Sequence, residues 1–354
     1  MQSHEFDDLR GKKVLVTGGC GYIGSHAVWQ LLDTGMSVVV IDTLEYGFLE
    51  MIDSKLAKDM IGRDLVDGEL SFYQGSIGDV AVLVKIFAEH ADIIGVINFA
   101  AYIEVGESVI VPLKYYENNT STVIKMVPIL LKNNIKFFVQ SSTAAVYGEV
   151  TTEEPIDENH PTIPINPYGS SKLMVERILE DACKAHGLQY ICFRYFNVCG
   201  AHISGMISQN KPKPSLLIPL VLKAASGERP SVSIYGTDYD TRDGTCIRDY
   251  IDVEDLIRAH IMGLQYLFRG GECQIINLGS SSGSTVKEII ESVKKVTGRD
   301  FKVEITGRRA GDPKILIASN KKAKEVLGWE PKNSVEYSIA NCWKYLQRCE
   351  KVNK

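Results

Sequence analysis

The stretch KVLVTGGCGYIG, residues 13–24, decides the fold of this chain. Its first five residues, Lys13 to Thr17, enclose an apolar run of valine and leucine, which is typical of a buried strand, and the pattern from Ile23 to Leu32 predicts a helix after it. Glycines at 18, 21 and 24 allow a tight turn, close backbone approach to a pyrophosphate, and close packing of helix on strand. The amino end of the helix then faces the negative charge of the ligand. This order of elements predicts a dinucleotide site.

The next expected strand, Ser37–Asp42, ends in a carboxylate 24 residues after Gly18. A carboxylate at this point accepts hydrogen bonds from the adenine ribose and repels a 2′-phosphate. The sequence therefore favours NAD over NADP.

Short β-branched runs alternate with helical patterns through the first half of the chain, which predicts an α/β fold with a parallel sheet. Further strands are expected at Leu70–Tyr73, Ile93–Phe99, Lys136–Ser141 and Gln189–Phe196, and helices at Val80–His90, Tyr115–Asn133 and Tyr168–His186. We expect Pro128 to kink or split the second of these helices. After about Asn197 the elements are shorter, which predicts that the dinucleotide site belongs to a first domain at 1–197 and that a second, smaller α/β domain follows at 198–354, with some chain crossing between them.

A second motif, PYGSSKLMVER at 167–177, follows the helix-start signal Asn166-Pro167. Tyr168 and Lys172 are four residues apart, so a helix puts phenol and ammonium on one face. A phenol of pKa about 10 needs help of about 4 kcal/mol to act as a base at neutral pH, and a lysine cation favours its charged form. This spacing also occurs by chance in many solvated helices, so its meaning depends on the rest of the chain.

Composition excludes several classes of protein. The chain has 354 residues, 45% of them hydrophobic, a net charge of −5 and a pI near 5.9, which argues against a nucleic-acid partner. We expect a cytoplasmic protein without a membrane partner, because no apolar run reaches the 18 or so residues of a membrane span and the opening MQSHEFDDLRGKK lacks an apolar signal core. The eight cysteines are scattered without a C-x-x-C pair, so neither a metal site nor a disulfide framework is expected.

Six segments together resemble the extended short-chain dehydrogenase/reductase family. They are TGGCGYIGSH, NFAAYIEVGES, SSTAAVYG, PYGSSK, RYFNVCGA and RDYIDVEDL, in the family's order within roughly residues 12–331. They are most similar to the members that epimerise UDP-hexoses at C4. The resemblance implies a doubly wound (Rossmann) NAD domain followed by a smaller domain that holds the nucleotide sugar. It also implies reversible interconversion of UDP-glucose and UDP-galactose by a homodimer formed through the helices expected at Tyr115–Asn133 and Tyr168–His186, with NAD bound and recycled.

The resemblance assigns the chemistry to three residues. Tyr168 would take the proton of the sugar 4-hydroxyl while C4 gives a hydride to NAD, and would return that proton after the 4-keto sugar has turned over. Lys172 would lower the pKa of Tyr168 and hydrogen-bond the nicotinamide ribose. Thr143, which lies 25 residues before Tyr168, would hydrogen-bond the sugar hydroxyl, although such a residue also caps strand ends.

Contacts to the cofactor and the substrate follow from the same resemblance. The implied cofactor residues are Gly18, Gly21, Tyr22, Ile23 and Gly24 at the pyrophosphate, Asp42 at the ribose, Ser76 and Ile77 at the adenine, and Phe99, Ala100, Ala101, Asn119 and Tyr195 elsewhere. The implied substrate residues are Asn197, Arg248 and Arg309 at the diphosphate, Asp312 at the uridine ribose, and Leu217, Ser233 to Tyr235 and Tyr250 beside uracil or sugar.

Three positions depart from the family's pattern. Ile103 stands where many bacterial members carry a lysine that touches the cofactor, so we expect weaker NAD retention. Leu216 replaces a polar residue near the nucleotide. Leu316 stands beside the sugar's 2-position, where some members carry a bulky tyrosine, and leucine leaves more room. The last departure motivates the hypothesis that UDP-N-acetylglucosamine, and with it other UDP-N-acetylhexosamines, is also accepted.

Three other readings compete with C4 epimerisation of UDP-glucose. A 4,6-dehydratase of the family needs a carboxylate pair after Thr143, where this chain has Ala144-Ala145. A UDP-glucuronate 4-epimerase or decarboxylase needs a cation for the C6 carboxylate, and none is recognisable. A non-catalytic NAD-binding sensor typically lacks the tyrosine or the lysine, and both Tyr168 and Lys172 are present.

Overall fold

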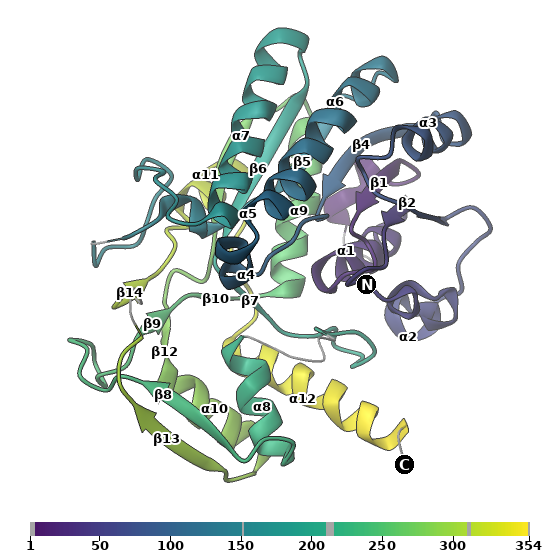
Figure 1. Cartoon of the computed structure of the whole chain (residues 1–354). Coiled ribbons are helices and arrows are strands. Elements are labelled where there is room, and N and C mark those ends of the chain that lie inside the picture. Colours follow the sequence, from purple (N-terminus) through teal and green to yellow (C-terminus); the bar gives the residue numbers. More distant parts are fainter. Residues whose placement is uncertain (1–3, 151, 210–215, 310–312, 353–354) are drawn as a thin grey trace. The chain divides into compact units, whose positions relative to one another are not determined.

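The computed structural model describes residues 4–150, 152–209, 216–309 and 313–352 (Figure 1). The backbone divides into two compact units. Unit 1 comprises Met1–Gly148, His160–Arg194 and Ile257–Ile276, and unit 2 comprises Glu149–Asn159, Tyr195–Leu256 and Asn277–Lys354. The chain therefore passes from one unit to the other several times.

A seven-stranded sheet organises unit 1, in the order β11-β6-β5-β4-β1-β2-β3. Its strands are β1 (Lys13–Thr17), β2 (Ser37–Asp42), β3 (Leu70–Gln74), β4 (Ile93–Asn98), β5 (Phe137–Ser141), β6 (Gln189–Tyr195) and β11 (Gln274–Leu278). The pairings from β3 through β1 to β6 are parallel. The strand order reverses between β1 and β4, which is where a doubly wound fold binds its ligand. The predicted α/β fold with a parallel sheet is confirmed.

Helices cover both faces of this sheet. The helices that begin in unit 1 are α1 (Tyr22–Asp33), α2 (Ala57–Ile61), α3 (Val80–Glu89), α4 (Val105–Ile110), α5 (Pro112–Tyr115), α6 (Thr122–Lys132) and α7 (Pro167–His186). Leucine, isoleucine and valine side chains of α3, α6 and α7 share one buried cluster with Leu15, Val96 and Phe138 of the strands. On the opposite face, His260 of α9 (Val253–Phe268) packs on Phe193 with ring centroids 4.8 Å apart.

The predicted helix at Tyr115–Asn133 is the element that differs most from expectation. Residues Tyr116–Ser121 form a π-helical segment, and α6 then runs unbroken from Thr122 to Lys132 with Pro128 inside it. Of the two outcomes expected at Pro128, a kink or a split, the split is wrong. Proline removes one backbone hydrogen bond, while Val123, Met126, Val127 and Leu130 of the same helix are buried in the core, and this packing outweighs the lost bond.

Unit 2 is built from shorter elements around its own core. Its strands are β7 (Asn197–Cys199), β8 (Ser231–Tyr235), β9 (Ile247–Arg248), β10 (Tyr250–Asp252), β12 (Ser284–Thr285), β13 (Lys302–Thr306) and β14 (Ile315–Leu316). Its helices are α8 (Leu217–Ser226), α10 (Val286–Thr297), α11 (Lys321–Leu327) and α12 (Val335–Val352). Side chains of α8, α10 and α12 bury a second hydrophobic cluster. None of the helices that the structure describes combines the length and apolar character that a bilayer crossing requires.

Candidate active site

The turn between β1 and α1 admits glycine alone at two of its positions. Gly18 has φ +68°, and a Cβ built there would lie 2.8 Å from the amide nitrogen of Ala100. A Cβ on Gly24 would lie 2.1 Å from the carbonyl oxygen of Gly18. Gly21 is the N-cap of α1 and has no side chain to fill the space in front of the first amides of the helix. The turn thus leaves bare backbone at a helix start, which fits a pyrophosphate.

Asp42 ends β2 beside this turn. Its Oδ2 accepts a hydrogen bond from the amide of Cys20 at 2.9 Å, and its Oδ1 accepts one from the amide of Leu44 at 2.8 Å. Burial raises the pKa of Asp42, and the two backbone hydrogen bonds oppose this shift. The carboxylate is thereby fixed in orientation next to the glycines. These residues fit a dinucleotide with a free ribose diol.

The other predicted cofactor residues also lie at the carboxyl ends of the strands. Ser76 and Ile77 follow β3, Phe99 to Ala101 follow β4, and Tyr195 ends β6. Asn119, in the π-helical segment, accepts a hydrogen bond from the amide of Tyr102 at 2.8 Å and donates to the carbonyl of Tyr102 at 3.0 Å. It also donates to Ser171 Oγ of α7 at 3.1 Å. Asn119 therefore holds the loop after β4 against α7.

Tyr168 and Thr143 form a buried hydroxyl pair. Asn166 caps α7 by accepting a hydrogen bond from the amide of Gly169 at 2.8 Å, which places Tyr168 in the first turn. Burial raises the pKa of Tyr168, and a hydrogen bond with Thr143 opposes the shift. Thr143 also caps the 3-10 turn Ala144–Tyr147 by accepting from the amide of Ala145 at 3.2 Å. Both readings of Thr143, strand-end cap and hydroxyl partner, are therefore compatible with its position.

Lys172 lies one turn further along the same buried face of α7. Its Nζ donates a hydrogen bond to the carbonyl of Ser141 at 2.9 Å, and burial lowers its pKa to about 8. The expectation that Lys172 lowers the pKa of Tyr168 stays a prediction. Burial raises the pKa of Tyr168 and the hydrogen bond with Thr143 opposes this shift, while the Lys172 ammonium donates to the carbonyl of Ser141.

A buried ion pair lies behind these residues and was not anticipated from the sequence. Glu176 accepts hydrogen bonds from Arg194 Nη2 at 2.6 Å and from Nε at 3.0 Å, and Ser142 Oγ also donates to it. Ser142 directly precedes Thr143, so the pair fixes the segment that carries the Thr143 hydroxyl. The four-residue spacing of Tyr168, Lys172 and Glu176 places Glu176 on the same face of α7, but no local pattern points to Arg194 of β6 as its partner.

Unit 2 contains a pocket of about 250 Å³ that gathers most of the predicted substrate residues. Asn197, Leu216, Leu217, Ser233, Tyr235, Arg248, Tyr250 and Arg309 all line it. The guanidinium of Arg309 stacks on the ring of Tyr235 at 3.7 Å from its centroid, and a hydrogen bond between them lowers the pKa of Tyr235. Arginines in a pocket wall of apolar and polar side chains suit a diphosphate, because they offer forked, charge-assisted hydrogen bonds.

Three further residues of unit 2 differ in how they relate to the pocket. Arg229 lines the same pocket and was missed, because no recognised motif contains it. Leu316 pairs with Arg248 across β14 and β9, which puts it next to the pocket wall. Asp312 lies outside the described residues.

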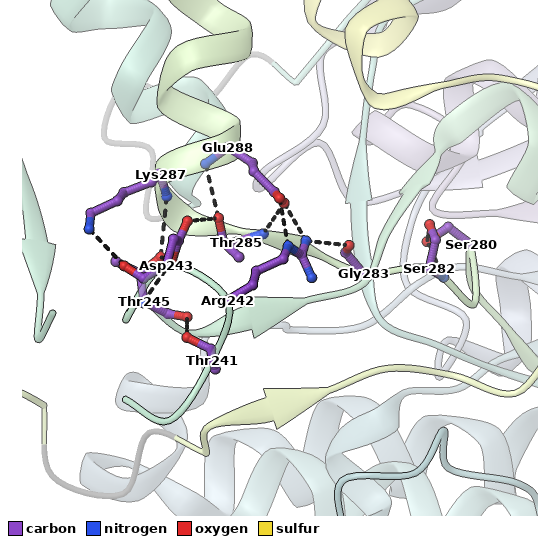
Figure 2. A network of polar contacts seen from close by, with 10 residues as sticks. All are labelled: Thr241, Arg242, Asp243, Thr245, Ser280, Ser282, Gly283, Thr285, Lys287 and Glu288. Carbon is purple, nitrogen blue, oxygen red and sulfur yellow. Dashed lines mark hydrogen bonds and ion pairs between the residues drawn. The ribbon is translucent and has the colours of Figure 1, made fainter. Parts of the chain in front are cut away.

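A polar network fixes the segment that leads into the pocket wall (Figure 2). Thr285 Oγ1, at the N-cap of α10, donates to Asp243 Oδ2 at 2.5 Å, and Lys287 Nζ donates to the carbonyl of Asp243 at 2.7 Å. Asp243 lies three residues before Cys246, which with Arg248 lines the pocket. The start of α10 thereby holds the approach to Arg248 in one conformation.

Comparison with known proteins agrees with this geometry. The profile of the NAD dependent epimerase/dehydratase family matches residues 14–279. A UDP-glucose 4-epimerase of Halalkalibacterium halodurans is 45% identical over 333 residues, which cover 94% of this chain and 95% of that protein. A solved UDP-glucose 4-epimerase from Stenotrophomonas maltophila, with bound NAD and formylated UDP-arabinopyranose, has a TM-score of 0.90 at 35% identity and covers 96% of this chain and 99% of its own. The UDP-Glc/GlcNAc 4-epimerase of Campylobacter jejuni has a TM-score of 0.82 at 40% identity, with coverages of 96% and 100%.

Three features of unit 1 fit an enzyme that uses NAD: the glycine turn, the fixed Asp42 carboxylate and the buried Tyr168 phenol. The profile match spans well over half of the chain, and the relative from Halalkalibacterium halodurans covers 94% of it. The chain belongs to the NAD-dependent epimerase/dehydratase family.

Proposed function

We propose that the protein interconverts UDP-glucose and UDP-galactose at C4 of the hexose. The observation that carries the proposal is the buried Tyr168 phenol, hydrogen-bonded with Thr143, in a unit whose glycine turn fits NAD. The relatives compared above are named 4-epimerases of UDP-sugars.

The chemistry divides between the cofactor and the side chains. Bound NAD would supply the acceptor for the hydride of C4 and the donor for its return. Tyr168 removes the proton of the 4-hydroxyl as C4 loses its hydride, so that a 4-keto sugar forms, and Tyr168 gives the proton back when the hydride returns to the opposite face. Thr143 holds the reacting hydroxyl and stabilises the phenolate, since its hydrogen bond lowers the pKa of Tyr168. Substrate and product have the same oxidation state, so no external reductant is consumed.

The predicted site residues and domains extend this proposal. Residues of unit 1 hold NAD, with Gly18, Gly24 and Asp42 at the pyrophosphate and ribose. Residues of unit 2 hold UDP, with Arg248 and Arg309 at the diphosphate. The assignment of UDP to unit 2 is supported by the pocket that Arg248 and Arg309 both line and by the stacking of Arg309 on Tyr235.

The competing activities are not favoured. The turn Ala144–Tyr147 directly after Thr143 carries no carboxylate, which a dehydratase would need there. The named relatives reported above act as UDP-sugar 4-epimerases, and none of those names is a UDP-glucuronate enzyme or a sensor.

The test is incubation of the purified protein with UDP-galactose without added reductant, followed by chromatographic identification of the product. We expect UDP-glucose as the product. Tyr168→Phe should lose about 10²- to 10⁴-fold in rate, because it removes the acid–base group, while NAD stays bound. Thr162→Val, which changes a hydroxyl on the loop before α7, is the control. Equal rates for Tyr168→Phe and the unaltered protein would exclude the mechanism.

We also propose that UDP-N-acetylglucosamine is a substrate. Leu316 supports this, since it lies opposite Arg248 in the β14–β9 pairing and is smaller than tyrosine. Leu316→Tyr should lower kcat/KM for the N-acetyl sugar far more than for UDP-glucose. No turnover of the N-acetyl sugar by the unaltered protein at millimolar concentration would contradict this substrate.

A homodimer and a cytoplasmic location complete the proposal. Ile124 of α6 and Met174 of α7 are 53% and 42% exposed, which supports a partner surface on the two helices expected to form the dimer. Light scattering of Ile124→Glu should then show a shift from dimer toward monomer. The eight cysteines are all free of disulfides, as is typical of a reducing compartment.

A further inference from the structure

Four side chains join the loop after β2 to the segment after β4. They are Glu45, Tyr46, Tyr102 and Lys114, and we call them the clasp. Tyr102 Oη donates a hydrogen bond to Glu45 Oε2 at 2.6 Å, and Lys114 Nζ donates to Tyr46 Oη at 3.3 Å. The rings of Tyr46 and Tyr102 meet edge to face with centroids 5.7 Å apart.

The clasp is anchored firmly on its β4 side. The amide and the carbonyl of Tyr102 are both hydrogen-bonded by the buried side chain of Asn119. Lys114 lies 4.4 Å from the centroid of the Tyr102 ring and is paired with Glu107 at 3.0 Å. Burial and Glu45 raise the pKa of Tyr102 to about 12, so its hydroxyl is a proton donor throughout the neutral range.

Both joined segments also lie against the glycine turn. On the β2 side, the amide of Phe48 donates to the carbonyl of Cys20 at 2.9 Å. On the β4 side, the backbone of Ala100 packs so closely on Gly18 that a Cβ there would be 2.8 Å away. Because β1 pairs with β2 on one side and β4 on the other, the two segments flank the turn. The clasp thus closes a ring of contacts across the place where β1 ends.

We infer that this ring encloses bound NAD and that the Glu45–Tyr102 contact must open before the cofactor leaves. A dinucleotide whose ribose meets Asp42 and whose pyrophosphate meets Gly18 to Gly24 would lie along the flanked turn, between the two joined segments. The clasp therefore slows NAD release, in opposition to the weaker retention expected from Ile103. The inference rests on the NAD dependence of the proposed function.

The experiment follows NAD release from the purified holoenzyme. Protein freed of unbound cofactor is mixed with a glycohydrolase that destroys released NAD, and protein-bound NAD is measured over time after precipitation. Tyr102→Phe keeps the ring and removes only the hydroxyl, so release should become roughly 2- to 12-fold faster, as expected for one lost hydrogen bond. Glu45→Gln should act similarly, and the double variant should release NAD no faster than the faster single variant, because both changes break the same contact.

Glu117→Gln, an exposed carboxylate outside the clasp, is the control and should not change the release rate. Melting temperatures of all variants exclude a global loss of structure as the cause. Unchanged release in Tyr102→Phe and Glu45→Gln, or fully additive effects in the double variant, would overturn the clasp and leave the proposed function intact. An unaltered protein that binds no NAD would overturn both.

Discussion

Replacing Glu176 with glutamine removes one charge of a buried ion pair and leaves the other in place. The side chains of Glu176 and Arg194 are 2% and 5% exposed, and Arg194 reaches the carboxylate through Nε and Nη2. A buried charge that loses its partner costs about 3–5 kcal/mol of folding free energy. For a unit of this size each kcal/mol corresponds to about 2–4 °C, so Glu176→Gln should lower Tm by about 6–20 °C.

Glu180→Gln is a matched control on the same helix. Glu180 is four residues further along α7 and pairs with Lys184, but these side chains are 48% and 67% exposed. Solvent screens an exposed pair of this spacing and leaves it little effect on stability, so Tm should change by less than about 2 °C. Thermal unfolding followed by circular dichroism compares the two variants at the same pH and NAD concentration.

A double variant separates buried charge from lost packing. Glu176→Leu with Arg194→Met removes both charges and keeps similar volume, so most of the stability lost in Glu176→Gln should return. If Glu176→Gln melts within about 2 °C of Glu180→Gln, the reasoning from burial is refuted. If the double variant is less stable than Glu176→Gln, hydrogen bonds from Arg194 and Ser142 matter more than the unpaired charge.

Three further changes test the site. Burial lowers the pKa of Lys172 to about 8 from an ordinary 10.5, so between these values the unfolded chain binds more protons and the folded protein gains stability as pH rises. Lys172→Met lacks this gain, so its melting temperature relative to the unaltered protein should fall from pH 8 to pH 10. A difference in melting temperature that stays constant over this range would contradict the argument. Thr143→Val should raise the pKa of Tyr168 and shift the rising limb of the pH–rate profile upward, with about a tenfold loss at neutral pH for each unit, whereas Thr143→Ser should retain the native profile. Gly24→Ala should abolish NAD binding because its Cβ would lie 2.1 Å from the carbonyl oxygen of Gly18, while Gly106→Ala, with nothing within 4 Å of its Cβ, should keep NAD and add about 0.5–1 kcal/mol of stability, as denaturant titration would show.

Local patterns predicted the elements around the cofactor closely. β1 and β2 have the expected bounds, Lys13–Thr17 and Ser37–Asp42, because apolar runs between glycines and polar residues leave little choice of register. The start of α7 could be predicted from Asn166-Pro167, and the Asn166 side chain caps the helix. The continuation of α6 through Pro128 could not be predicted from the sequence, because it depends on core contacts made by neighbouring residues.

The residues of the unit 2 pocket could be predicted from the sequence only through the family resemblance. Tyr235 and Arg309 come together because β8 and β13 pair in parallel with Tyr235 opposite Thr306. No local pattern fixes that pairing, since both strands are short and only Val232 and Ile234 of β8 are buried. Arg229 precedes β8 outside any recognised motif, and only the fold brings it to the pocket wall. The domain bounds predicted at residue 197 stay a prediction.

The buried face of α7 explains why its lysine keeps a usable charge. Tyr168, Lys172 and Glu176 follow one another at four-residue spacing, so a direct pairing of Lys172 with Glu176 is within reach of the helix geometry. Arg194 and Ser142 occupy the carboxylate of Glu176 instead, and the Lys172 ammonium donates to the carbonyl of Ser141. A tight Lys172–Glu176 pair would raise the lysine pKa and neutralise its field. With Arg194 as the counter-ion of Glu176, the charge of Glu176 raises the pKa of Lys172 only in part, and burial holds that pKa at about 8. Lys172 is then positively charged at neutral pH, which is the state that its proposed contact with the cofactor ribose requires.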